Sequence, residues 1–362
     1  MEEINHTQNV VFSVDIPSGI HAGSGQILGC CIKADYTITF GYKKLGLVLY
    51  PGCEYAGRVY CEEVGFAPDA IYLASPTAFT YDESDFIRIP KRSARSNKGT
   101  YGKVLVIAGS PNMSGACYLS AKAAYRTGTG LVKILTAEEN RVILQTSLPE
   151  AILATYEDTT EKTELLQEIE WASVIVIGPG IGASPIVDTI LELVIKYAKV
   201  PVVIDADALN LLAKRPDKEE ILTQLSEQFV LTPHLMEMSR LNLKTLQEIK
   251  QNVPGVAEEM VMEKKYTLVL KDARTIVARD GKQYVNCSGN HGMATAGAGD
   301  VLTGIIAGFM AGGMTSYEAA CLGVYVHGLA GDSARKKQGA YSLMAEDMIE
   351  GISEVLKNQD IE

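Results

Sequence analysis

The chain has 362 residues, which at roughly 100 to 200 residues per domain corresponds to two domains, or to one large α/β domain with an appendage. Hydrophobic residues make up 47% of it and charged residues 21%, a balance that excludes disordered and fibrous proteins. The net charge of -11 repels nucleic-acid backbones and anionic lipids, so we expect neither nucleic acid nor a membrane as a partner. Anionic ligands must then be held locally, by helix N-termini and glycine-rich turns.

The cysteines and the apolar segments favour a reducing compartment. The seven cysteines show no C-x-x-C spacing, so the sequence predicts neither a disulfide framework nor a zinc site. The most apolar long stretch, residues 301–314, is shorter than a membrane span, and the N-terminus lacks the pattern of a signal peptide. We therefore expect a cytoplasmic protein.

The first part of the chain predicts a small, incomplete α/β fragment. Residues 10–14 (VVFSV) and 36–40 (YTITF) are typical of strands, with glycine and proline between them in the segment DIPSG, residues 15–19. About 70 residues with almost no helical pattern are few for an independent core. Between residues 67 and 102 the periodicity is lost and prolines gather, which predicts a domain boundary.

Downstream of this boundary, strands and helices alternate. A helix is expected near residues 115–127 and a helical region over residues 300–356. Strands are predicted at residues 104–108, 131–135, 174–177, 202–204, 229–231, 267–270 and 275–278. This alternation predicts a mainly parallel sheet with helices on both faces. Ligands of such sheets lie beyond the carboxyl ends of the strands, so the residues that follow each strand are the candidates for chemistry.

The glycine-rich loop Gly297-Ala298-Gly299-Asp300, which precedes an apolar helix, is the strongest of these candidates. Small residues let a phosphate approach the backbone, and the amides that open the helix stabilise negative charge. Asp300 can there take a proton from a substrate hydroxyl. The structural alternative is that Asp300 only caps the helix, but the long run of small residues before it, 289–295, favours the functional interpretation.

Two more loops have a functional and a structural interpretation. The turn at residues 178–182 (GPGIG) resembles a dinucleotide-binding loop, but its spacing does not fit, and a tight connection between strand and helix explains it as well. The segment 108–116 (AGSPNMSGA) is either a substrate-facing loop or a connection in which Ser114 caps the next helix.

Single polar residues at strand ends are also candidates. Of Asp205 and Asp207, one is expected to cap a helix, while the other can orient Mg²⁺ through water or bind a substrate hydroxyl. His234 is either a packed or capping residue or a catalytic one. Lys271 is either a solvated charge at the edge of the sheet or a nucleotide contact.

From about Ser93 to Leu356, the chain resembles the NAD(P)H-hydrate dehydratase family, which has a ribokinase-like fold. The segments that carry the resemblance are KGTYGKVLVIAGSPNMSGA, VIGPGIG, VIDADALN, LTPHLMEMSRL and GNHGMATAGAGDVLTGIIAG, in this order. The N-terminal segments VDIPSG, IKADYTITFG and YAGRVY resemble the C-terminal half of the NAD(P)H-hydrate epimerase domain, a Rossmann-like α/β domain fused to this dehydratase in bifunctional repair enzymes. The resemblance implies an epimerase fragment at residues 1–75, a linker at 76–95 and a dehydratase domain at 96–362.

The reaction that the resemblance implies is removal of water from the (6S)-hydrate of NADH or NADPH. ADP drives it in bacterial-type members of the family and ATP in others, with Mg²⁺. A phosphoryl group activates the hydroxyl of the hydrate while Asp300 takes its proton; with ADP as donor, AMP and phosphate are released. The amides of Ala296, Gly297, Ala298 and Gly299 would hold the migrating phosphoryl group.

Carried over by motif, the resemblance implies contacts to both ligands. The hydrate contacts are Ala116, Gly182, His234 and Asp300, and the nucleotide contacts are Lys271, Asp272, Ala273, Arg274, Thr275 and Gly299. The chain departs from the family at Asp272, where glycine is usual, and at Ala298, where serine is frequent. The first change bears on the adenosine loop and on the preference for ADP.

In the epimerase fragment, Asp15 matches a substrate contact and Ser18 a potassium ligand. The N-terminal half that would supply their partners is not in the sequence, so we expect little or no epimerase activity.

Two other functions stay open. An ATP-dependent kinase of a sugar or vitamin precursor would use the same glycine-rich loop and leave the phosphoryl group on its product. A non-catalytic nucleotide-binding protein would bind without turnover. We also expect a homo-oligomer that associates through apolar helix faces such as residues 317–325, and the resemblance suggests a tetramer.

Overall fold

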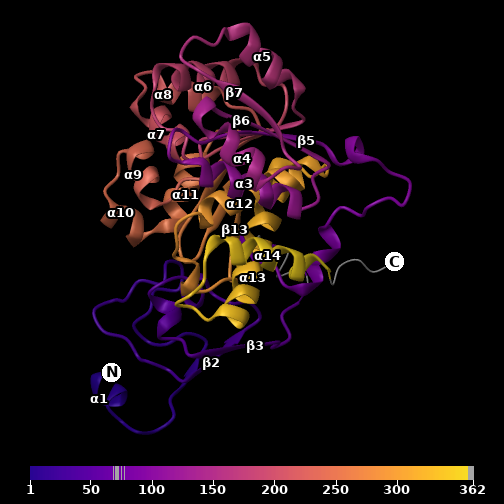
Figure 1. Ribbon diagram of the computed structural model, residues 1–362. Coiled ribbons are helices and arrows are strands. Elements are labelled where there is room, and N and C mark those ends of the chain that lie inside the picture. Colours follow the sequence, from indigo (N-terminus) through magenta and orange to yellow (C-terminus); the bar gives the residue numbers. More distant parts are fainter. Residues whose placement is uncertain (68, 70–72, 75, 77, 358–362) are drawn as a thin grey trace. The chain divides into compact units, whose positions relative to one another are not determined.

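In a computed structural model, the chain divides into two compact units. The structure describes residues 1–67, 69, 73–74, 76 and 78–357. The first unit comprises Met1–Phe79 and Thr245–Val256, and the second comprises Thr80–Lys244 and Ala257–Glu362 (Figure 1).

The first unit contains a small parallel sheet with the strand order β1-β2-β3. Its strands are β1 (Phe12–Val14), β2 (Tyr36–Phe40), β3 (Arg58–Glu62) and, apart from this sheet, β4 (Ala78–Phe79); its helices are α1 (Glu2–Asn5), η1 (Leu45–Leu47), η2 (Gly52–Glu54) and α10 (Leu246–Gln251). Both predicted strands are confirmed, while β3 was missed. On one face of the sheet Thr37 and Thr39 are buried, and on the other the rings of Phe12 and Tyr36 stack with their centroids 5.0 Å apart.

The second unit is an α/β structure built on one large sheet. Its strands are β5 (Lys103–Ile107), β6 (Leu131–Ala137), β7 (Ile152–Tyr156), β8 (Val174–Ile177), β9 (Val202–Ile204), β10 (Phe229–Leu231), β11 (Thr267–Leu270), β12 (Ile276–Arg279) and β13 (Lys282–Val285). Its α-helices are α3 (Ser114–Arg126), α4 (Arg141–Ser147), α5 (Lys162–Trp171), α6 (Pro185–Tyr197), α7 (Ala206–Lys214), α8 (Lys218–Gln224), α9 (Leu235–Asn242), α12 (Ala298–Ala311), α13 (Ser316–Gln338) and α14 (Ala345–Lys357). The boundary between the units falls within α11 (Val253–Val261), which belongs to the second unit from Ala257 onward. Short 3₁₀ helices are η3 (Glu83–Arg88), η4 (Lys98–Tyr101), η5 (Glu138–Asn140) and η6 (His291–Met293).

Within the second unit, the strands of this sheet follow the order β13-β12-β11-β10-β9-β8-β5-β6-β7. Neighbouring strands from β11 to β7 are parallel, while β12 and β13 are antiparallel additions. Because β5 pairs with β6 on one side and with β8 on the other, the strand order reverses at β5. In open parallel sheets, such a reversal marks the crevice in which ligands bind.

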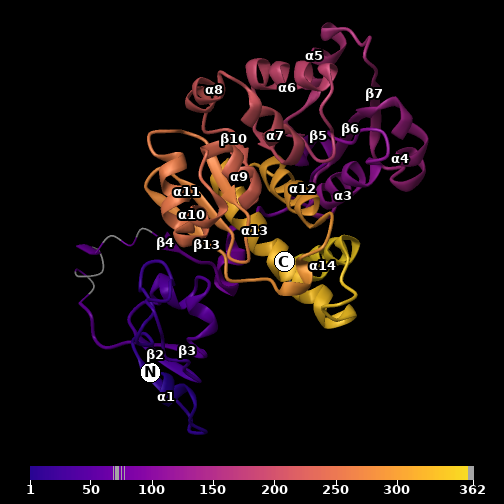
Figure 2. The same cartoon turned by 90° about the vertical axis from the view of Figure 1, so that its left-hand side faces the viewer.

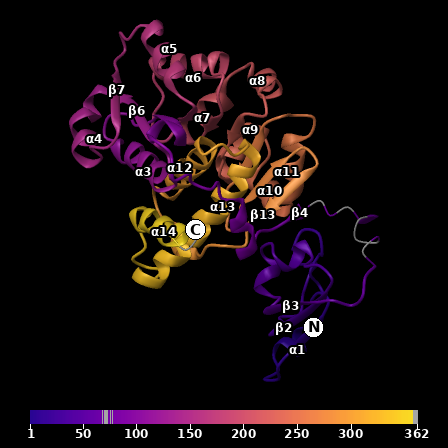
Figure 3. The same ribbon diagram turned by 90° about the vertical axis from the view of Figure 1, so that its right-hand side faces the viewer.

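Helices cover both faces of the sheet. α3, α12 and α13 pack on one face, and α5, α6 and α7 lie on the other (Figures 2 and 3). Every residue of β8 is buried, as the continuous apolar run of a central parallel strand predicts. α12 is buried at each position from Val301 to Met310, so this helix is apolar on all sides and runs through the core. The predicted mainly parallel sheet with helices on both faces is confirmed.

Glycine allows α12 and α3 to approach each other closely. A Cβ atom at Gly304 would lie 2.2 Å from the carbonyl oxygen of Ser120, a distance that excludes any side chain. The helix that opens at the glycine-rich loop is thus fixed directly against the helix that follows β5.

Two expectations about packing need correction. Part of the predicted linker at residues 76–95 is packed: η3 lies in it, and Tyr81, 8% exposed, belongs to the hydrophobic core. The proposed association surface at residues 317–325 is also wrong, because α13 buries Ala319 to Tyr325 inside the unit. Among the described residues, no helix combines the length and the apolar character needed to cross a bilayer.

Candidate active site

The site lies at the carboxyl ends of the central strands, where hydrogen bonds join the predicted loops. The amides of Gly109 and Ser110, after β5, donate to the carbonyl oxygens of Pro179 and Gly180, after β8, at 2.9 and 2.6 Å. The amide of Gly182 donates to Asp207 Oδ2 at 2.9 Å, which joins the β8 loop to the first turn of α7.

Ala116 lies beside the same turn. A Cβ atom at Gly180 would be 3.0 Å from that of Ala116, so the structure brings together the loops that carry the predicted hydrate contacts Ala116 and Gly182. The cap expected at Ser114 is not formed, because α3 begins at Ser114 and its N-cap is Met113.

The glycine-rich loop presents free amides at the start of α12. Its N-cap is Gly297, whose φ of 87° is left-handed and whose Cβ atom would lie 2.5 Å from Leu119 Cδ1. Among the described residues, the amides of Ala296, Gly297 and Gly299 have no hydrogen-bond acceptor, and Ala298 donates one long bond of 3.4 Å to Thr295. Unpaired amides at a helix N-terminus form a site for an anion.

Asp300 lies in the first turn of this helix and does not cap it, so the structural alternative is wrong. Its backbone oxygen accepts a hydrogen bond of 3.0 Å from Ser120 Oγ. Burial, together with the negative charges of Asp205 and Asp207, raises the pKa of Asp300 to about 7, against the opposing effect of Lys271. A carboxylate with a pKa near neutrality is suited to accept a proton from a hydroxyl group.

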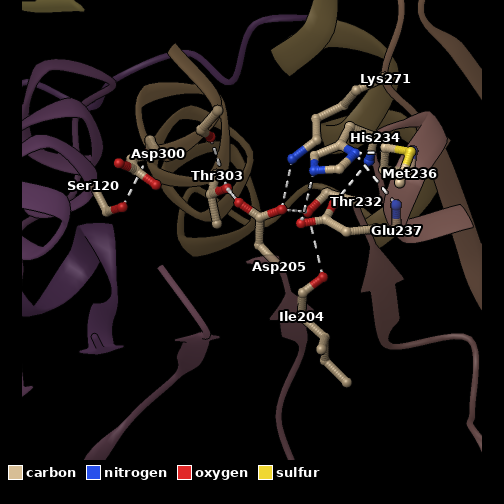
Figure 4. Close-up of polar contacts among 11 residues, drawn as sticks. Ser120, Ile204, Asp205, Thr232, His234, Met236, Glu237, Lys271, Asp300 and Thr303 are labelled. Atoms are coloured by element: carbon tan, nitrogen blue, oxygen red, sulfur yellow. Dashed lines mark hydrogen bonds and ion pairs between the residues drawn. The ribbon is translucent and has the colours of Figure 1, made fainter. Parts of the chain in front are cut away.

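Behind the loop, Asp205 is the centre of a buried polar network (Figure 4). Its carboxylate is 1% exposed and accepts hydrogen bonds from Thr232 Oγ1 at 2.7 Å, Lys271 Nζ at 2.7 Å and Thr303 Oγ1 at 2.8 Å. Asp205 occupies the N-cap position of α7 without capping it, because these donors engage its side chain. The network also leaves Asp205 poorly suited to orient Mg²⁺, and the described residues contain no cluster of His, Cys, Asp or Glu side chains able to hold a metal ion.

Lys271 is not the solvated edge charge that one interpretation predicted. Its side chain is 18% exposed and pairs with Asp205. Burial disfavours its ammonium, but the carboxylates of Asp205, Glu237 and Asp300 outweigh this effect and raise the pKa of Lys271. Its Nζ lies 3.4 Å from the position of a Cβ at Gly299, which places a cation beside the free amides of α12.

The remaining predicted nucleotide contacts form the turn between β11 and β12. Asp272 and Ala273 are exposed. Arg274 Nη1 donates to the carbonyl oxygen of Cys287 at 3.3 Å, and Thr275 Oγ1 donates to that of Asp272 at 3.1 Å. Nothing in these contacts assigns the turn to a nucleotide, so its role stays a prediction.

His234 caps α9, as the structural interpretation predicted. Its Nδ1 accepts hydrogen bonds from the amides of Met236 and Glu237, and its own amide donates to Glu237 Oε2. Since Nδ1 is an acceptor, the neutral ring carries its proton on Nε2, 3.3 Å from Glu237 Oε1. Burial and the charge of Lys271 lower the pKa of His234. Half of the side chain is exposed, so the cap does not prevent the predicted contact with a hydrate.

Three residues of the site were missed in the sequence. Thr303 donates a hydrogen bond to the carboxylate of Asp205, and Ser120 donates one to the backbone oxygen of Asp300. The sequence marks each of them only as a hydroxyl residue within a helix of otherwise apolar or small residues. The third is His327 on α13, whose ring forms a hydrogen bond with the backbone of Ala298 and whose buried Nε2 has no partner in the part of the chain that the structure describes. Nothing in the pattern of α13 distinguishes this histidine.

The first unit holds the two residues predicted for an epimerase site. Asp15 Oδ1 accepts hydrogen bonds from Thr39 Oγ1 at 3.0 Å and from Lys44 Nζ, and the bond from Lys44 lowers the pKa of Asp15. Ser18 is exposed. A single exposed hydroxyl is a poor fit for a bound cation, which needs several oxygen ligands, so we derive no step through potassium.

Together, the sheet and the site define an α/β enzyme of the kind that holds a phosphoryl group at a helix N-terminus. A family model described as NAD(P)H-hydrate dehydratase matches residues 104–354, and one described as YjeF-related protein N-terminus matches residues 1–46. The bifunctional NAD(P)H-hydrate repair enzyme Nnr of Moorella thermoacetica is 38% identical over 371 residues, which cover 99% of this chain and 69% of that protein. The chain belongs to the NAD(P)H-hydrate dehydratase family.

Solved structures agree with this assignment. A ribokinase-like superfamily protein from Enterococcus faecalis V583 has a TM-score of 0.70 at 30% identity, covering 78% of this chain and 96% of its own. The ADP/ATP-dependent NAD(P)H-hydrate dehydratase from Bacillus subtilis, co-crystallised with ATP/Mg²⁺, has a TM-score of 0.66 at 30% identity, covering 76% of this chain and 97% of its own. The predicted ribokinase-like fold is confirmed.

Proposed function

We propose that the chain dehydrates the (6S)-hydrate of NADH or NADPH with ADP as the phosphoryl donor. The observation that carries the proposal is the arrangement at α12: a carboxylate with a pKa of about 7 beside free helix amides and a buried ammonium. These three groups can serve as a proton acceptor, an anion hole and a counter-charge for a phosphoryl group during its transfer. Family membership favours a hydrate of NAD(P)H as the hydroxyl compound.

In the proposed reaction, Asp300 takes the proton of the hydrate's hydroxyl as its oxygen attacks the β-phosphorus of ADP. A new P–O bond forms, and the bond to the AMP oxygen breaks. The C–O bond of the phosphorylated hydrate then breaks, phosphate leaves with the electron pair, and loss of a proton from the neighbouring carbon restores the double bond. Hydroxide is a poor leaving group and phosphate a good one, which explains why a dehydration is coupled to a nucleotide.

The other assignments are part of the same proposal. Residues 96–362 form the dehydratase domain, and residues 1–75 correspond to an epimerase fragment. Ala116, Gly182 and His234 face the hydrate, and Lys271 with residues 272–275 and Gly299 faces the nucleotide. Mg²⁺ is expected on the nucleotide's phosphates, because in such sites Mg²⁺ is usually held by substrate phosphates, several waters and only one or two carboxylates. A tetrameric state and a cytoplasmic location remain predictions.

The test is recovery of nicotinamide absorbance when the protein is mixed with NADPH hydrate, ADP and Mg²⁺. We expect recovery together with equal amounts of AMP and phosphate. Asp300→Asn is expected to lower turnover by at least about 100-fold, because a positioned general base contributes factors of this size, and to leave ADP binding intact. ATP in place of ADP then reports the donor preference.

The same experiment separates the alternatives. An ATP-dependent kinase would give no absorbance recovery and would leave a phosphorylated product when offered hydroxylated vitamin precursors. A non-catalytic protein would bind ADP without releasing phosphate. Unchanged turnover in Asp300→Asn would remove this residue from the mechanism.

A further inference from the structure

Lys271 has hydrogen-bond donors to spare at the start of α12. An ammonium carries three N–H donors, and the one directed at Asp205 accounts for the single partner that the described residues give Nζ. Because Nζ lies 3.4 Å from the Cβ position of Gly299, its other donors are close to the free amides of the loop. An anion bound at these amides would therefore meet Lys271 as well.

A lysine side chain is flexible, so its position must be fixed by something else. Asp205 is the group that does so here, with Nζ 2.7 Å from its Oδ1. The carboxylate itself is immobilised by Thr232 on the same oxygen and by Thr303 on the other.

The two threonines connect this carboxylate to two different segments of the site. Thr232 follows β10, whereas Thr303 lies in α12, one turn after Gly299, and its hydroxyl is also 2.9 Å from the carbonyl oxygen of Gly299. One buried carboxylate thus sets the distance between the end of β11, which carries the lysine, and the helix that carries the anion hole. Figure 4 shows Asp205 between Lys271 and Thr303.

We propose that Asp205 is a positioning residue that fixes the Lys271 ammonium against the first turn of α12, so that the lysine meets the phosphoryl group during its transfer. This inference rests on the proposed function only in that a phosphoryl group is transferred at α12. Asp205 acts through Lys271 in this proposal, since protein donors already engage both of its oxygens.

The first test is Asp205→Asn, with Asp217→Asn as the matched control. Asp217 is paired with Arg215 beyond the far end of α7, and its loss should leave kcat unchanged. For Asp205→Asn we expect kcat to fall about 10- to 100-fold, the size of effect that a misplaced group causes, while the Kd for ADP stays within about threefold. A role confined to folding would instead lower the melting temperature and weaken ADP binding together with kcat.

A double mutant identifies the partner through which Asp205 acts. If the effect passes through Lys271, Asp205→Asn lowers kcat in the wild type but adds little in a Lys271→Met background. If the loss of kcat in the double variant equals the product of the losses in the two single variants, the proposal is overturned.

The pH profile gives a further readout. Asp300 faces Asp205, Asp207 and Lys271, with the Cys117 thiol on α3 also within electrostatic range. Asp205→Asn removes the negative charge that, after burial, raises the pKa of Asp300 most, with an effect larger than that of Lys271. Its loss favours the ionised form of Asp300, so the acid limb of the kcat profile should move to lower pH. An unmoved limb would contradict the proposed geometry.

A binding measurement separates failure of this inference from failure of the proposed function. Vanadate with AMP mimics the phosphoryl group in the transition state of its transfer, and its binding can be measured without turnover. We expect Asp205→Asn to bind vanadate with AMP about 10- to 100-fold more weakly than the wild type. A wild type that binds vanadate but never dehydrates the hydrate would overturn the proposed function alone, whereas equal vanadate affinity in the two proteins would overturn the role of Asp205.

Discussion

The hydroxyl of Ser120 on α3 donates a hydrogen bond of 3.0 Å to the backbone oxygen of Asp300 on α12. Ser120 is fully buried, so water cannot replace this bond. Since α3 also carries Ala116, the bond links a predicted hydrate contact to the proposed base.

We predict that Ser120→Ala lowers kcat about 3- to 10-fold and the free energy of unfolding by about 1 kcal/mol, the usual net contribution of one hydrogen bond. Thr127→Ala is the matched control, because Thr127 Oγ1 donates to the carbonyl oxygen of Ala123 at the other end of α3. It should lose similar stability in urea and keep kcat. Equal kcat losses in both variants would show that α3 acts only through the stability of the fold.

The raised pKa of Asp300 makes turnover depend on pH near neutrality. Because the ionised form is the base, kcat should fall as the pH drops through about 7, with half of the activity lost near that value. The measurement is kcat against pH in buffers of constant ionic strength. An acid limb near pH 4, the range of an ordinary aspartate, would contradict the buried environment of this carboxylate.

The same shift predicts how Asp300 affects stability. Its pKa is higher in the folded state than in the unfolded chain, whose value is near 3.8, so the folded state binds the extra proton between these pH values. Stability therefore decreases as the pH rises through this window. Asp300→Asn removes the buried charge and should raise the unfolding free energy more at pH 8 than at pH 5, as urea titrations at the two pH values would show.

Alanine substitutions at Gly297 and Gly299 test the conformation of the loop and its anion hole separately. Alanine at 297 would have to adopt a φ of 87° with its Cβ 2.5 Å from Leu119 Cδ1, so Gly297→Ala should lose about 1–3 kcal/mol of stability. Alanine at 299 meets only Lys271 Nζ, at an ordinary contact distance of 3.4 Å. Gly299→Ala should therefore melt like the wild type but turn over more slowly, since its methyl group enters the anion hole. The reverse pattern would mean that α12 does not begin as described.

His327 predicts a loss of stability in acid. Burial lowers the pKa of His327 to about 4 from 6.5, so the unfolded chain binds a proton in this interval and the folded protein does not. Stability thus falls as the pH drops from 6.5 toward 4, by up to about 1.4 kcal/mol per pH unit. His327→Asn should show a correspondingly smaller slope in guanidinium unfolding over this range, and an unchanged slope would exclude a buried neutral ring.

The sequence predicted the strands β8, β9, β10 and β11 to the residue because their runs of Val, Ile, Leu and Phe are bounded by clear turns. It missed β7 and β13, in which polar residues interrupt the apolar run: Thr155 in β7, and Lys282 and Gln283 in β13. Hydrophobic periodicity is weakest for such strands, and pairing with a neighbour is what stabilises them.

At the site, the candidate loops followed from the rule that ligands lie beyond strand ends, but the roles of individual side chains did not. Asp205 and His234 look alike in the sequence, as polar residues directly before a helix. His234 caps its helix, whereas three donors from distant segments engage Asp205. Such contacts depend on where β10, β11 and α12 meet in space, and no local pattern records them.

The depth of α12 has a consequence for how the protein loses activity. The helix that carries Asp300 is buried for ten consecutive residues, Val301 to Met310, so its amides should be among the slowest of the protein to exchange with deuterium. Because Asp300 lies on α12, the proposed base cannot be displaced unless the core around this helix opens. Heat inactivation and global unfolding are therefore expected to coincide, with no inactive but still folded state between them.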